Sequence, residues 1–115
     1  MILNMKTEIE SYIKIPIVGN KFQSRKPNKT DVNILLIKED ENPHDSNAVG
    51  VYSKHYIDNS SVSKLTKLGF IIRDKTSFIR ENYDNIEVYK IIRSANKNDD
   101  GTYYYYILLN IINKT

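Results

Sequence analysis

Residues 35–51 have the sequence Leu-Leu-Ile-Lys-Glu-Asp-Glu-Asn-Pro-His-Asp-Ser-Asn-Ala-Val-Gly-Val, in which an acidic, polar segment separates two apolar runs. The first run, Val32–Ile37, predicts a strand, and its near-continuous apolar character favours burial on both faces. Asn42–Asp45 is a strong turn signal because Asn-Pro initiates turns. The second run predicts a short strand over Ala48–Tyr52. The stretch is therefore typical of two strands joined by a polar turn.

Outside this stretch, the sequence predicts four more strands and one clear helix. Tyr12–Ile17 alternates with a period of two, and Pro16, which cannot donate to a ladder, favours an edge strand or a local break. Asp74 is a candidate N-cap for a helix over Lys75–Tyr83. The other strands are expected at Leu68–Ile72, after a polar connection at His55–Lys67, and at Ile86–Ile92 and Thr102–Ile112, which form a hairpin with a long loop.

The last two strands carry two patterns of their own. Strict alternation in Ile86–Ile92 puts Ile86 and Val88 on one face and Tyr89 and Ile91 on the other. The final strand opens with four tyrosines, Tyr103–Tyr106. Either two of these rings lie in the core and two cover an edge, or they form a stacking platform for nucleic acid or an aromatic patch for a protein.

Six short strands with one or two short helices predict an all-β to α+β fold, a small OB- or SH3-like six-stranded barrel. The 115 residues fit one domain, with 1–11 as an N-terminal lead and 12–115 as the domain. The chain has no cysteine, which excludes a disulfide scaffold, an Fe–S cluster, a Cys-ligated zinc and a Cys nucleophile. Because no apolar stretch approaches membrane-spanning length, we expect no membrane contact and an intracellular, cytoplasmic protein, in the host cytoplasm if it is phage-encoded.

The charge is unevenly distributed along the chain. Five basic residues and no acid lie between Ser11 and Thr30, and five more face only one acid between Lys64 and Arg80. Two basic segments that meet on one face would form a surface for an anionic ligand. The alternative is a set of ordinary solvated lysines. The basic residues are Lys14, Lys21, Arg25, Lys26, Lys29, Lys64, Lys67, Arg73, Lys75 and Arg80.

The octapeptide Asn42–Val49 resembles the signature of the HIRAN domain, in which a strand and a basic–acidic pair precede Asn-Pro-Tyr-Asp-x-Asn-Ala-Ile. The flanks agree with the family in order and spacing. Val18–Phe22 lies where the family has its first strand and a glycine followed by a basic–aromatic pair. Leu68–Ile71 lies where the family has a Gly-aromatic-hydrophobic strand before a helix. The resemblance spans about residues 12–112 and implies the HIRAN fold.

The resemblance also implies a role at DNA ends. HIRAN domains of helicase-like remodellers bind single-stranded DNA at its 3′-hydroxyl end and direct the attached motor to stalled forks. By position, it implies that Lys21 contacts phosphate, Phe22 stacks on a base and Asp45 meets the terminal hydroxyl. Asn42 would be a supporting polar residue.

Three positions depart from the family pattern. His44 stands where the family usually has Tyr, Gln23 where a second aromatic often follows, and Phe70 where a polar residue or Tyr is found. We include His44 and Phe70, together with the basic Arg25 and Lys26, among the expected nucleic-acid contacts.

The residue chemistry alone leaves two interpretations of this region. Asn42 and Asp45 can hydrogen-bond their own backbone and fix the turn, which is the structural interpretation and the favoured one for Asn42, Pro43, Asn47 and Ala48. The functional interpretation is that an acid, a ring and a cation hold a nucleotide. A carboxylate at that point repels phosphate, so such a site prefers a free hydroxyl terminus.

Catalysis and cofactors are not expected. Two histidines 11 residues apart give no metal-ligand spacing, and the sequence has no Gly-rich phosphate loop. The sequence predicts a non-catalytic module that binds single-stranded DNA ends or stalled, damaged DNA in repair, with a helicase or nuclease as a possible partner. The alternative is a protein-interaction module of a phage or mobile element that binds or inhibits a host nucleic-acid enzyme. No oligomeric state is predicted.

Overall fold

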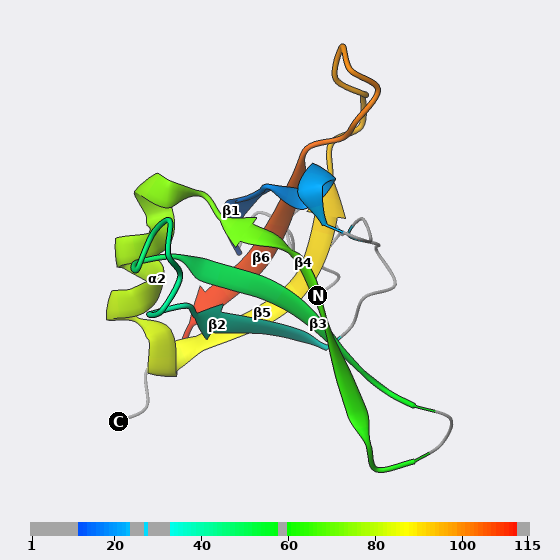
Figure 1. Cartoon of the computed structure of the whole chain (residues 1–115). Coiled ribbons are helices and arrows are strands. Elements are labelled where there is room, and N and C mark those ends of the chain that lie inside the picture. Colours follow the sequence, from blue (N-terminus) through cyan, green and yellow to red (C-terminus); the bar gives the residue numbers. More distant parts are fainter. Residues whose placement is uncertain (1–11, 24–26, 28–32, 58–59, 113–115) are drawn as a thin grey trace, which may run out of the picture.

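The computed structural model describes residues 12–23, 27, 33–57 and 60–112 (Figure 1). The N-terminal lead, residues 1–11, lies outside them, so the domain boundary at residue 12 stays a prediction. The described strands are β1 (Ile13–Val18), β2 (Ile34–Lys38), β3 (Val49–Tyr56), β4 (Ser63–Ile71), β5 (Ile86–Arg93) and β6 (Tyr105–Ile111). The described helices are α2 (Thr76–Glu81) and three 3-10 turns, η1 (Asn20–Phe22), η2 (Arg73–Lys75) and η3 (Tyr83–Asn85).

The six strands form one antiparallel sheet in the order β2-β3-β4-β1-β6-β5. The sheet curls until its two outer strands, β2 and β5, approach each other. The Tyr83 hydroxyl donates a hydrogen bond to the Leu36 carbonyl and so ties η3 to β2. The result is the small β-rich barrel with a short helix that the sequence predicts, and the fold class is confirmed (Figure 1).

The barrel is filled by the inward-facing residues of its strands. Ile79 of α2 is fully buried among them and Phe78 is partly buried against them, so the helix packs on the barrel through these two side chains. Each fully buried apolar side chain contributes about 1.5–3 kcal/mol by leaving water. Within the described ranges, no helix is long and apolar enough to span a bilayer. The buried cluster consists of Ile15, Ile17, Leu36, Val49, Val51, Leu68, Ile71, Ile79, Ile91, Tyr105, Ile107 and Leu109.

The expectation that the strand over Val32–Ile37 is buried on both faces is wrong, and of the two alternatives for the strand with Pro16 the structure shows the local break. β2 lies at an edge of the sheet, and only Leu36 of it is buried, while Leu35 is 39% exposed. β1 lies inside the sheet rather than at its edge. Pro16 is tolerated because its pairing with Tyr106 of β6 is intact, while β4 pairs with β1 only at Ile17 and Val18. The ladder to β4 therefore stops just before the proline, as a local break would require.

The polar connection expected at His55–Lys67 is also wrong. β3 and β4 form a long hairpin that pairs from Gly50 opposite Phe70 out to Tyr56 opposite Ser63. In Figure 1 this hairpin projects well away from the barrel. Serine, threonine and lysine residues gave the segment a loop-like composition, but cross-strand pairing decides its conformation.

The helix and the last hairpin need smaller corrections. Asp74 lies within η2 and is not the cap, since α2 begins after Lys75 without a side-chain cap. In β5, the pairing shifts at Tyr89, where a β-bulge reverses the alternation and turns Ile91 into the core beside Val88.

Of the four tyrosines, Tyr105 is buried, Tyr103 packs against the core and Tyr104 is 60% exposed. Two of these rings therefore contact the core while Tyr104 faces solvent, which favours the core-and-edge interpretation.

Candidate nucleic-acid interface

The turn between β2 and β3 is held by Asn42, as the structural interpretation predicts. The Asn42 Oδ1 accepts hydrogen bonds from the backbone N–H groups of His44, at 2.9 Å, and Asp45, at 3.2 Å. Its Nδ2 donates to Glu39 Oε1 at 3.1 Å. Asp45 fixes the next step, because its Oδ1 accepts from the Asn47 N–H at 2.9 Å. The Asx turn is therefore confirmed, whereas contact of these residues with nucleic acid stays a prediction.

Arg80 of α2 clamps the same turn from the other side. Its Nε donates to the Asn47 carbonyl at 2.8 Å, and its Nη2 donates to the Ser46 and Ala48 carbonyls, each at 3.0 Å. Its Nη1 lies 2.8 Å from Asp40 Oδ1. Arg80 was counted among the cations for an anionic ligand, but the structure uses it internally. The sequence held no local sign of this role, since a guanidinium on a helix reaches carbonyls more than 30 residues away only through the fold.

Glu39 is the centre of a second network that sequence reasoning missed. Its carboxylate lies 2.7 Å from Lys67 Nζ and accepts a 2.8 Å hydrogen bond from the Tyr52 hydroxyl. Burial raises the pKa of this carboxyl, but hydrogen bonds from Lys67, Tyr52 and Asn42 outweigh it and the pKa is lowered. Burial and the Glu39 charge together raise the pKa of Tyr52. Gly50 makes the room, because a Cβ there would lie 2.3 Å from Glu39 Oε2.

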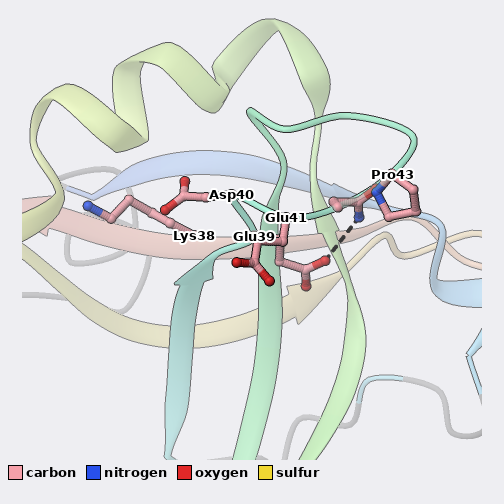
Figure 2. Close-up of a pocket in the computed structure, with 6 residues that line it drawn as sticks. Lys38, Glu39, Asp40, Glu41 and Pro43 are labelled. Carbon is pink, nitrogen blue, oxygen red and sulfur yellow. Dashed lines mark hydrogen bonds between the residues drawn. The ribbon is translucent and has the colours of Figure 1, made fainter.

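An open pocket lies beside this network. Figure 2 shows the Glu39, Asp40 and Glu41 side chains around it and the hydrogen bond to Glu39 as a dashed line. Lys67 neutralises Glu39 and Arg80 neutralises Asp40, which leaves Glu41 as the unpaired carboxylate among the described lining residues. Because Lys38 lines the same pocket, the lining has no clear excess of either charge. Among the described residues, no cluster of three His, Asp or Glu side chains could hold a metal ion. Its lining residues are Lys38, Glu39, Asp40, Glu41, Asn42 and Pro43.

A β-bulge in β4 places Lys67 and Phe70 on one outer face. Val51 pairs with Gly69 but Tyr52 pairs with Lys67, so Leu68 is an extra residue and points into the core. The Lys67 ammonium consequently lies 4.1 Å from the centre of the Phe70 ring. This contact connects the Glu39 network to an aromatic surface.

Phe70 in turn packs against the start of η1. Gly19 has a φ of 71°, a left-handed conformation that favours glycine, and a Cβ there would approach the Phe70 ring to 3.2 Å. η1 follows at once and presents Phe22, which is 80% exposed. Lys21 lies in η1, but its side chain, like Arg25 and Lys26 as a whole, lies outside the described residues.

Asp45 and His44 lie on the outer side of the turn. His44 is exposed, and Asp45 is partly buried. The Asp45 Oδ2 lies 3.6 Å from Nε of Arg73, whose side chain is 82% exposed. An accessible carboxylate thus sits beside an accessible guanidinium, which can pair with phosphate while the acid accepts a hydrogen bond.

The structure connects several of the expected contact residues and leaves others untested. Contacts run from the turn at Asn42 through Glu39 and Lys67 to Phe70 and Gly19. Phe22 follows Gly19 in η1. The role of all these residues in binding remains a prediction.

Comparison with solved structures finds a fold likeness to the crystal structure of the HIRAN domain of human HLTF. The TM-score is 0.50 and the sequence identity 14%, over 87% of this chain and 76% of that chain. No protein-family model matches the sequence, and neither does any curated protein. At this identity the likeness concerns the fold alone: the chain has a HIRAN-like fold, in agreement with the resemblance in its turn sequence.

Proposed function

We propose that this chain is a non-catalytic module that binds single-stranded DNA and recognises a free 3′-hydroxyl end. The observation that carries the proposal is the agreement of two independent features, the HIRAN-like fold and the Asn42–Val49 sequence within it. The resemblance supplies the ligand class, and the residues around the turn supply a chemistry that suits it.

Each proposed contact follows from an accessible group. The Asp45 carboxylate accepts a hydrogen bond from the terminal hydroxyl and repels a terminal phosphate. Arg73, 3.6 Å away, pairs with the preceding phosphate. Phe22, which is 80% exposed, offers a ring for the base. Stacking on one ring is worth about 1–3 kcal/mol, so Phe22 is the largest single contributor we expect.

The proposal is tested by fluorescence anisotropy with single strands of about 12 nucleotides, within the range that small barrels bind, that end in a 3′-hydroxyl or a 3′-phosphate. We expect the hydroxyl end to bind more tightly and the preference to vanish in Asp45→Ala. Asp99→Ala is the matched control, because Asp99 is an exposed acid in the β5–β6 connection. Equal affinity for both ends in the unmodified protein would refute end recognition.

A second experiment addresses the phosphate contact assigned to Lys21. Because each phosphate contact releases counterions, Lys21→Ala should reduce the slope of log affinity against log salt by about one unit. An unchanged slope would place Lys21 outside any phosphate site.

A further inference from the structure

We propose that the outer face of the β3–β4 hairpin is a second binding surface, along which a single strand held at its 3′ end continues in the 5′ direction. We call it the hairpin track and define it by Lys54, Tyr56, Leu65, Lys67 and Phe70. The inference rests on the proposed function, and it adds a substrate length and a direction that the end site does not specify.

The pairing register puts these side chains on one face. Tyr56 pairs with Ser63, Lys54 with Leu65, Tyr52 with Lys67 and Gly50 with Phe70. Residues that pair across an antiparallel ladder point to the same side, and every second residue repeats that side. Without the bulge at Leu68, Lys67 and Phe70 would face opposite sides. With it, the track is continuous from the hairpin tip to η1.

Lysines and rings alternate along the track. The Lys54 ammonium lies 5.7 Å from the Tyr56 ring centre. Lys67 lies 5.5 Å from the Tyr52 ring centre and 4.1 Å from that of Phe70. A single strand presents bases and phosphates in the same alternation, and proteins that bind it without sequence preference combine aromatic stacking with a positive groove.

The outer half of the hairpin has no role in the barrel core. β2 pairs with β3 only as far as Ser53, and β4 pairs with β1 only at Phe70 and Ile71. Beyond these points the hairpin is a two-stranded ribbon, yet it exposes Tyr56 at 57% and Leu65 at 45%. Apolar side chains that stabilise no core and face solvent together mark a binding surface.

The charge of the hairpin selects an anionic, base-bearing occupant. From Val51 to Arg73, no described residue is acidic, and the one acid of that sequence, Asp58, lies outside the described residues. Glu39 neutralises Lys67, so Lys54 carries the attraction to phosphate on this face. Rings, aliphatic surface and an uncompensated lysine together fit a single-stranded nucleic acid better than an apolar protein segment.

The length of the track sets the range of strand lengths over which the affinity for DNA should rise. Six residues separate the Gly50–Phe70 level from the Tyr56 level, which corresponds to about 20 Å of strand. A DNA that occupies only the end site cannot cover this distance, so affinity should grow with length until the tip at Tyr56 is reached.

The test compares 3′-hydroxyl strands of about three and about 12 nucleotides, below and within the range that small barrels bind. We expect the longer strand to bind more tightly and Tyr56→Ala to weaken it by about fivefold or more, since stacking on one ring has that value. The same variant should leave the short strand unaffected, and Lys54→Ala should lower the salt slope for the long strand alone.

Two substitutions in the β5–β6 connection are matched controls. Tyr104 is an exposed tyrosine at 60%, and Lys97 an exposed lysine, on a loop that projects from the opposite side of the barrel in Figure 1. Tyr104→Ala and Lys97→Ala should bind both strands normally, and thermal unfolding verifies that every variant is folded.

The outcomes separate the track from the end site. If both lengths bind equally and Tyr56→Ala changes nothing, the track is wrong while the hydroxyl preference still stands. If Tyr56→Ala abolishes the length dependence but no hydroxyl preference exists, the track holds and end recognition is wrong. If neither strand binds, both proposals are overturned.

Discussion

The β2–β3 turn and the β3–β4 hairpin share strand β3 but are built in opposite ways. The backbone of the turn is held by hydrogen bonds from Asn42 within it and from Arg80 of α2, and most charged side chains of the turn are paired. The outer hairpin is two strands wide, and its rings and aliphatic side chains face solvent. A fixed turn suits recognition of one chemical end, whereas an extended ribbon suits contact that repeats along a chain.

Among substitutions that do not truncate a core side chain, the largest effect is expected at the bulge in β4. A Cβ on Gly69 would lie 2.7 Å from both Ile17 Cγ2 and the Val18 carbonyl oxygen, and backbone cannot move aside cheaply. Gly69→Ala should therefore lower the free energy of unfolding by about 2–4 kcal/mol, at or above the usual cost of overpacking. Urea unfolding measures it.

Gly101→Ala is the control for the bulge. Gly69 has a φ of 156° and Gly101 a φ of 82°, but a Cβ on Gly101 would meet nothing within 4 Å. It should cost only the backbone term, about 1–2 kcal/mol. Equal losses for the two variants would mean that conformation, and not the close approach, makes Gly69 necessary.

The next effect concerns the clamp on the turn. Arg80→Ala removes the guanidinium donors from Asp40 and from the Ser46, Asn47 and Ala48 carbonyls, although the Ala48 carbonyl keeps the Glu39 N–H. Because the guanidinium is only partly buried, we expect a loss of about 2 kcal/mol. Arg80→Lys keeps the charge but lacks the planar fork, so it should restore only part of the loss. Urea unfolding compares both with Arg73→Ala, which removes an 82% exposed arginine and should change stability by less than about 0.5 kcal/mol. Full restoration by lysine would show that only the charge matters.

A smaller effect comes from the pH dependence of Glu39. Because the pKa of Glu39 is lowered in the folded chain, its ionised form stabilises the fold above pH 4.5, the ordinary value. This stabilisation is lost as the pH falls through the lowered pKa. Glu39→Gln should therefore flatten the decline of thermal stability on the acid side, whereas Glu41→Gln, an exposed neighbour, should leave the decline unchanged. If the thermal stability of Glu39→Gln and that of the unmodified protein fall in parallel as the pH is lowered, ionised Glu39 does not stabilise the fold.

The two regions also differ in how far the sequence predicted them. The turn was predictable because Asn-Pro and the Asx side chains act on backbone within three residues. The hairpin was missed because its strands are specified by pairing between Tyr56 and Ser63 and between their neighbours, not by local composition. The same limit explains Glu39 and Arg80, whose partners lie 28 and more than 30 residues away. The inward and outward alternation of side chains in β5 reverses at Tyr89 because of a β-bulge, and no local sequence signal marks that bulge.

The smallest effect should come from the outer hairpin, where side chains contribute little to stability. Leu65→Ala removes a side chain that is 45% exposed and should change the free energy of unfolding by less than about 0.5 kcal/mol. Leu68→Ala, three residues along the same strand, removes a fully buried side chain and should cost about 2–5 kcal/mol. Urea unfolding of the pair measures where β4 changes from core to surface. A loss at Leu65 comparable to that at Leu68 would mean that the ribbon is part of the folded core, and its exposed rings would then need a structural explanation instead of a binding one.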